Sequence, residues 1–212
     1  MHIPDGLLDA KTWGTAWVLG GAALAYGATK TRERLQERQV PFMGVMAAFI
    51  FAAQMVNFPI AGGTSGHLLG AVLAAILLGP WTASIIMATI LALQAFVFLD
   101  GGVTALGANI LNMAVVAPFA GYWTYRLIQR VWNNRTGTLV ATFSAAWFSV
   151  VLAAGACAFE LAFSGMVPLR VVLPAMLGWH VLIGIGEAVI TTVVVGYLTQ
   201  VRADLVYETA KV

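Results

Sequence analysis

The sequence predicts an all-α integral membrane protein, with residues 1–212 forming one domain and one bundle of seven transmembrane helices. The composition supports this prediction: 60% of the residues are hydrophobic and 9% are charged, whereas soluble domains carry about 25% charged residues. The mean hydropathy of +0.88 agrees. A transmembrane helix needs about 20 residues, so seven of them leave no length for a soluble domain. The net charge of +2 argues against nucleic acid as a partner.

Apolar stretches of the sequence define the expected helices. They cover residues 13–29, 40–58, 67–79, 81–99, 105–129, 138–164 and 174–200. The third run is short for a membrane span and ends at Gly79-Pro80, where a helix is expected to break.

The distribution of Lys and Arg predicts the orientation in the membrane. These residues concentrate in segments 30–38 and 126–135 and in the C-terminal tail, which holds Arg202 and Lys211, and seven spans put all three regions on one side. The positive-inside rule makes that side cytoplasmic, so we expect the N-terminus outside and the C-terminus inside the cell. The first residues lack the basic stretch of a signal peptide, and we therefore expect the mature chain to begin at Met1.

Two external connections are rich in glycine and contain no Lys or Arg, namely residues 59–67 and 100–109. Irregular backbone at membrane depth persists only where protein or a water-filled cavity satisfies its polar groups. Both segments are therefore expected to line a site.

Small residues recur at four-residue spacing in Gly44, Ala48 and Ala52, and again in Ala71, Ala75 and Gly79. Such spacing lets helices approach one another closely. The first set is a candidate docking face for a partner subunit, and packing inside the bundle is the alternative for both sets.

His2 stands next to the N-terminus and could chelate a metal through three nitrogens. These are the Met1 amine, the deprotonated backbone nitrogen of His2, and the nearer imidazole nitrogen. The chelate rings hold the nitrogens close to one plane, and planar nitrogen coordination favours Ni(II) or Cu(II). His67, on the same side of the membrane, could supply the fourth nitrogen. The alternatives are a surface residue at a frayed end for His2 and a hydrogen-bonded interior residue for His67.

Gln94, Asn109 and Asn112 are candidates to orient a metal-bound imidazole from outside the ligand set. Hydrogen bonding between helices is the alternative role for all three.

A different class of function is suggested by Ser65, which lies in a Gly-Thr-Ser-Gly sequence. With His180 as general base it could act as an intramembrane serine protease, provided that the two side chains come within hydrogen-bonding distance. The sequence contains no phosphate-binding loop and no other nucleotide motif, so the chain itself is not expected to hydrolyse ATP.

Three motifs resemble the CbiM/NikM family, the substrate-binding membrane subunits (S components) of energy-coupling-factor transporters for nickel and cobalt. They are MHIPDG at residues 1–6, GGTSGHLLG at 62–70 and GANILNMA at 107–114. The resemblance implies a seven-helix bundle with the N-terminus tucked into its core, and metal bound by nitrogens of Met1, His2 and His67. The residues Ile3-Pro4-Asp5-Gly6 are more similar to the nickel branch of the family than to the cobalt branch.

The resemblance also implies partners: two ATPase subunits, a transmembrane coupling (T) subunit and, often, a small accessory membrane subunit. On this basis we expect a transport subunit that is not an enzyme, carries Ni²⁺ or Co²⁺ as substrate and uses no organic cofactor. A freestanding metal channel or secondary carrier is the remaining alternative, and it would need no ATPase partners.

Overall fold

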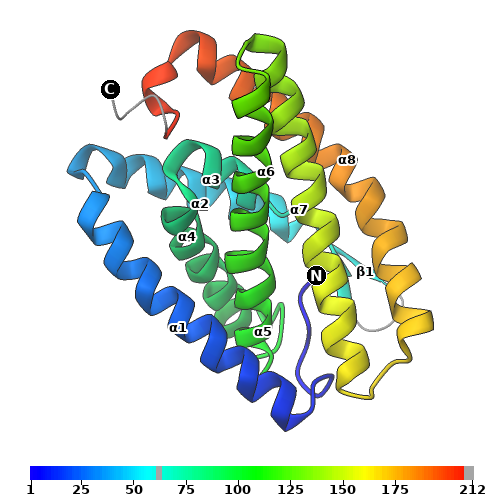
Figure 1. Cartoon of the computed structure of the whole chain (residues 1–212). Coiled ribbons are helices and arrows are strands. Elements are labelled where there is room, and N and C mark those ends of the chain that lie inside the picture. Colours follow the sequence, from blue (N-terminus) through cyan, green and yellow to red (C-terminus); the bar gives the residue numbers. More distant parts are fainter. Residues whose placement is uncertain (61–63, 208–212) are drawn as a thin grey trace.

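The computed structural model describes residues 1–60 and 64–207 (Figure 1). Gly62 and Gly63, which belong to the second family motif, and Lys211 of the C-terminal tail lie outside the described residues.

The described chain is mainly helical. Its α-helices are α1 (Ala10–Arg34), α2 (Val40–Met55), α3 (Ala71–Leu78), α4 (Pro80–Leu93), α5 (Leu106–Ile110), α6 (Ala117–Val131), α7 (Arg135–Phe163) and α8 (Leu169–Val201). Short 3-10 helices cover Glu37–Gln39 and Ala203–Leu205. A π-helical segment, Gln94–Phe98, extends α4, and another, Leu111–Val116, joins α5 to α6. Two short strands, β1 (Phe58–Ile60) and β2 (Thr64–Gly66), pair antiparallel, with Pro59 opposite Ser65.

Helices Pro80–Phe98, Arg135–Phe163 and Leu169–Val201 are long and apolar enough to cross a membrane. The protein is therefore a multi-pass membrane protein. The total of seven spans and the direction of the termini stay predictions.

Residues 67–79, the third apolar run, do not form the single helix that the sequence predicts. Helix α3 has eight residues, which gives a length of about 12 Å, far less than the roughly 30 Å of a bilayer core. Gly70 (φ 76°) and Gly79 (φ 86°) bound it in conformations that L-residues with side chains rarely adopt. The expectation of a helix over the whole run was therefore wrong, because residues 67–70 are not helical and connect strand β2 to α3.

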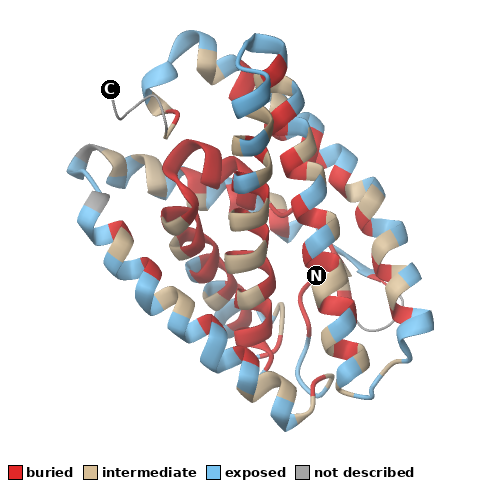
Figure 2. Cartoon of the chain, viewed as in Figure 1, coloured by how far each residue is buried: buried red, intermediate tan, exposed pale blue. Residues whose placement is uncertain are grey.

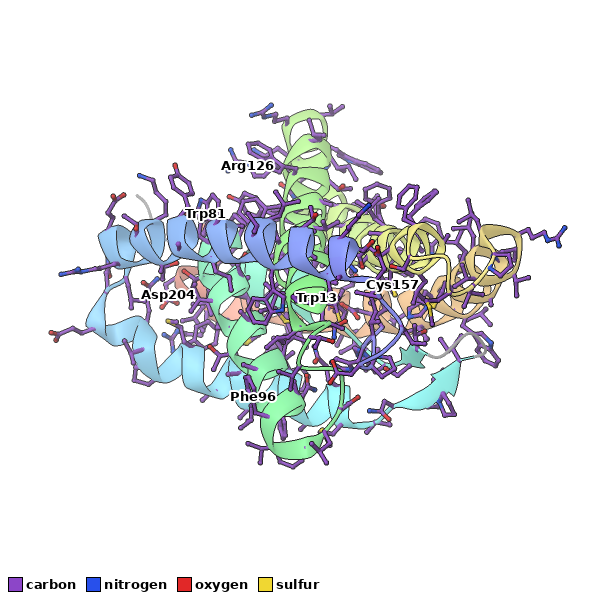
Figure 3. All side chains as sticks on the ribbon, turned by 90° about the horizontal axis from the view of Figure 1, so that it is seen from below. Trp13, Trp81, Phe96, Arg126, Cys157 and Asp204 are labelled. Carbon is purple, nitrogen blue, oxygen red and sulfur yellow. The ribbon has the colours of Figure 1, made fainter. Side chains whose placement is uncertain are left out.

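Buried residues gather in the middle of the bundle, around α3, α4 and the lower part of α6 (Figure 2). Every residue of α3 is buried. Helices α7 and α8 pack side by side along one flank, and α1 crosses the opposite flank (Figure 1). Trp81, at the start of α4, packs edge-on against Tyr26 of α1, with ring centroids 5.1 Å apart, and against Phe119 of α6, at 4.4 Å (Figure 3).

The two sets of small residues have different environments. Gly44, Ala48 and Ala52 are exposed on α2, opposite the buried face that holds Ile50 and Gln54. Ala71, Ala75 and Gly79 are buried. Close packing inside the bundle therefore accounts for the second set, whereas the first set lies on the outer surface of this chain.

Candidate metal centre

The N-terminal segment enters the bundle rather than extending into solvent. Met1 lies among the helices, and the chain runs from there to the rim of the bundle, where α1 begins (Figure 1). The side chains of Met1 and Ile3 are fully buried, and burial of each contributes about 1.5–3 kcal/mol. Asp9 then caps α1 by accepting a hydrogen bond from the backbone N–H of Thr12 at 3.0 Å.

Asn109 fixes the position of this segment at Ile3. Its Oδ1 accepts from the Ile3 N–H at 2.9 Å, and its Nδ2 donates to the Ile3 carbonyl at 3.1 Å. The backbone N–H of Gly102 donates to the same carbonyl at 2.8 Å. The polar backbone of a buried, non-helical segment is thereby satisfied, as membrane depth requires.

A second anchor lies at Asp5, whose carboxylate accepts from the backbone N–H groups of Val103 (3.0 Å) and Thr104 (2.7 Å). The hydrogen bond from the Thr104 hydroxyl is the main cause that lowers the pKa of Asp5. Gly102 permits this approach, because a Cβ on it would lie 2.3 Å from the backbone nitrogen of Asp5.

Three nitrogens of the first two residues surround one hydroxyl. The Oγ of Ser65, in β2, lies 3.3 Å from the Met1 amine, 3.3 Å from the backbone nitrogen of His2 and 3.5 Å from His2 Nδ1. The Met1 amine also donates to the Ser65 carbonyl. Burial lowers the pKa of the Met1 amine to about 5 and that of His2 to about 3. Both groups are therefore neutral near pH 7 and carry the lone pairs that a metal ligand needs.

His67 lies against this group of nitrogens. Its ring faces that of His2, with centroids 4.5 Å apart. Nδ1 of His67 donates to the Leu68 carbonyl at 2.8 Å, so Nε2 carries the lone pair of the neutral ring. That Nε2 is buried and has no hydrogen-bond partner among the described residues, which is costly unless a ligand occupies the site.

The residues that follow His67 are held by two helices. The carboxylate of Glu187, on α8, accepts from the backbone N–H groups of Leu69 and Gly70, the latter at 2.9 Å. The side chain of Gln54, on α2, donates to the Leu69 carbonyl at 2.7 Å. The two side chains fix the loop that carries the His67 imidazole. Neither was selected from the sequence for this role, although both are polar residues in apolar runs.

Of the three residues expected to orient an imidazole, Gln94 contacts one. It begins the π-helical segment after α4, and its Oε1 lies 3.1 Å from His2 Nε2. Asn109 instead holds the backbone of Ile3. Asn112 donates to the Glu160 carboxylate at 2.6 Å and has no recorded bond to a histidine in the described part of the chain.

The hydrogen bonds of Ser65 and His180 do not join these two residues in the described part of the chain. Ser65 Oγ contacts Met1 and His2, whereas Nδ1 of His180 contacts the carbonyl of Met176, one turn earlier in α8, at 2.7 Å. The structure therefore does not support the Ser65–His180 pair that the protease alternative required.

Asp100 is one of the polar residues that the sequence marks as functional candidates, because a carboxylate at the end of an apolar run is costly in lipid. No role at the metal centre was expected for it, yet it reaches His2. Its Oδ1 lies 3.3 Å from His2 Nδ1, and its Oδ2 accepts from Asn57 Nδ2 at 2.7 Å.

Among the described residues, no group of three or more His, Cys, Asp or Glu side chains could hold a metal ion. The candidate centre is of another kind, because two of its nitrogens belong to the chain terminus and the backbone.

A multi-pass helical protein with a buried group of neutral nitrogens has the properties of a metal-binding membrane subunit. The chain belongs to the CbiM family, because residues 2–205 match the model of that family, which is described as the cobalt uptake substrate-specific transmembrane region.

Relatives and a solved structure agree with this assignment. The chain is 44% identical to a "Putative fused nickel transport protein NikMN" of Archaeoglobus fulgidus, over 99% of this chain and 69% of that protein. It is 34% identical to the fused nickel transport protein NikMN of Rhodobacter capsulatus, over 97% of this chain and 63% of that protein. A crystal structure of a transition metal transporter superimposes with a TM-score of 0.89 at 39% identity, covering 95% of this chain and 93% of the other.

Proposed function

We propose that this protein binds one Ni²⁺ ion through four nitrogens: the Met1 amine, the backbone nitrogen and Nδ1 of His2, and Nε2 of His67. The observation that carries the proposal is the convergence of the first three nitrogens on Ser65 Oγ, at 3.3–3.5 Å. The unpartnered Nε2 of His67 supports the fourth.

The same arrangement favours nickel over cobalt. The Met1 amine, the His2 backbone nitrogen and its Nδ1 close two fused chelate rings, which keep the donors near one plane. Ni²⁺ accepts planar nitrogen coordination, and a site that uses neutral or deprotonated nitrogens suits it better than an oxygen-rich site. Co²⁺ is the second substrate to be tested.

We further propose that the protein is the substrate-binding S component of an energy-coupling-factor transporter. Its N-terminus and the metal centre face the outside of a prokaryotic cytoplasmic membrane, and its basic segments face the cytoplasm. Two ATPase subunits, a T subunit and a small accessory membrane subunit complete the transporter. The proposal is supported by the family membership and by the lack of a nucleotide motif in the chain.

A comparison of tagged forms tests the ligand set, because the amine can bind metal only if the chain begins at Met1. We expect protein with a tag after Val212, or with an N-terminal tag cleaved to leave Met1 first, to hold about one Ni²⁺ ion. It should absorb as a planar, diamagnetic complex. One residue added before Met1 converts the amine into an amide and forces extra atoms into a buried position, so this form should not bind.

Metal content by elemental analysis and uptake by cells give the two readouts. Full Ni²⁺ binding by the extended form would exclude the amine as a ligand and refute the proposal. An octahedral, oxygen-rich spectrum for the protein that begins at Met1 would refute it as well.

A further inference from the structure

We propose that Asp100 is the first residue to bind the incoming divalent cation and that it transfers the cation to the four nitrogens. This inference rests on the proposed function, to which it adds the route of loading.

Asp100 lies between solvent and the buried ligands. Its side chain is 18% exposed, whereas that of His2 is 2% exposed. One carboxylate oxygen, Oδ2, accepts from the amide of Asn57, which is itself exposed. The other oxygen, Oδ1, faces inward, 3.3 Å from His2 Nδ1. One carboxylate therefore reaches both the outside and a proposed ligand.

The contact between Asp100 and His2 suits a cation. His2 Nε2 lies 3.1 Å from Gln94 Oε1, and since an amide oxygen only accepts, Nε2 carries the proton of the neutral imidazole. Nδ1 then presents a lone pair, and Asp100 Oδ1 presents another toward it. Two facing lone pairs repel each other, and a metal ion between them could bind to both.

In the part of the chain that the structure describes, no Lys or Arg forms an ion pair with Asp100, and the His2 ring that lies 3.3 Å from it is neutral. A carboxylate that faces solvent without a Lys or Arg partner attracts cations and raises the rate at which they arrive.

The backbone around Asp100 is specialised for this position. Leu99 has φ 56°, the one positive φ among the described residues other than glycine, and Gly101 has φ 95°. A positive φ costs energy in a residue with a side chain, such as Leu99, and strain of this kind is concentrated at active sites and ligand sites. The N–H of Asp100 also donates to the carbonyl of Gln94 at 3.0 Å, so two of the residues that contact the His2 ring are directly linked.

The test is the rate of nickel loading, measured by mixing metal-free protein that begins at Met1 with NiCl₂ and following the absorbance of the planar complex. Asp100→Asn removes the charge but keeps the size of the side chain and a group that can hydrogen-bond to His2 Nδ1. We expect it to load at least about tenfold more slowly, and to reach the same one Ni²⁺ per protein and the same spectrum.

Asp9→Asn is the matched control. It removes the same charge from the N-terminal region, and asparagine caps a helix about as well as aspartate, so loading should keep the wild-type rate. Asp100→Glu restores the charge and should load faster than Asp100→Asn. Wild-type loading should slow as salt is added, because salt screens the attraction.

Asp100→Ala separates loading from positioning. If Asp100 only positions His2, Asp100→Asn should load at the wild-type rate while Asp100→Ala is slow, and that result would overturn the inference. A folded Asp100→Asn protein that never takes up metal would also overturn it, because Asp100 would then be a ligand of the final complex. Wild-type protein that takes up no Ni²⁺ would refute the proposed function itself, and the inference with it.

Discussion

The imidazole rings of His2 and His67 lie nearly parallel, with centroids 4.5 Å apart and an angle of 22° between their planes. One ring belongs to the second residue of the chain and the other to the loop before α3. The stacking places the two proposed histidine ligands side by side. Several predictions about the protein depend on this arrangement.

The first concerns His67, for which the chain offers a matched control. His67 and His180 are both buried, and each has Nδ1 hydrogen-bonded to a backbone carbonyl. In the part of the chain that the structure describes, the Nε2 of each has no hydrogen-bond partner. We expect His67→Ala to weaken Ni²⁺ affinity by about 100-fold or more, because a ligand is lost and loss of a residue that merely supports a ligand already costs up to that much. His180→Ala should keep wild-type affinity. Calorimetric titration of the two purified proteins measures the difference, and equal losses would contradict the assignment.

The second concerns pH. Burial lowers the pKa of the Met1 amine to about 5 and that of His2 to about 3, so protons compete for these groups only below those values. Near neutral pH, metal binding then displaces one proton, from the His2 backbone nitrogen. We expect affinity to fall about tenfold for each unit of pH between about 8 and 6, and more steeply below about 5 as the amine becomes protonated.

Titrations with Ni²⁺ in buffers of different pH measure this slope. An exposed amine with its ordinary pKa would add a second proton and make the fall about 100-fold per unit. An affinity that does not change with pH would indicate carboxylate ligands, such as Asp5, in place of nitrogens.

The third concerns Gln94, which accepts from His2 Nε2 and so leaves Nδ1 free for metal. Gln94→Leu removes this acceptor and should weaken Ni²⁺ affinity by about 10- to 100-fold, the usual effect of losing the partner of a ligating histidine. Asn112→Leu serves as the comparison, because Asn112 contacts Glu160 rather than a histidine. Its affinity for Ni²⁺ should change little, provided that detergent gel filtration shows the protein to be folded. Equal affinities for the two variants would remove Gln94 from the site.

The fourth concerns the exposed small residues of α2. Ala48→Leu adds bulk to an exposed face, so the isolated protein should fold and bind Ni²⁺ normally, but cellular uptake should be lost if the partner subunits dock there. Ala75→Leu makes the same change on a buried helix and should destabilise the protein by about 1–3 kcal/mol through overpacking. Thermal unfolding in detergent and uptake by cells that contain the partner subunits measure the two effects. Normal uptake with Ala48→Leu would exclude this face as the docking surface.

Much of the chain can be understood without its tertiary structure. The high apolar content and the length of the apolar runs determine a helical membrane protein, because only helices and closed barrels satisfy the backbone in lipid. His2 next to the chain terminus determines the chemistry of the candidate chelate, since its donors are fixed by covalent connection. The family motifs then indicate His67 as the fourth donor.

Other features were decided only by tertiary structure, because they depend on contacts between distant segments. Hydropathy does not distinguish an apolar helix from an apolar loop, so the eight-residue α3 and the hairpin before it were not predicted. Gln94, Asn109 and Asn112 are equivalent candidates in the sequence. The fold directs the first to the His2 ring, the second to the backbone of Ile3 and the third to Glu160. The approach of Asp100 to His2 arises in the same way, because the path of the buried N-terminus through the bundle, rather than any local pattern, determines which polar groups meet.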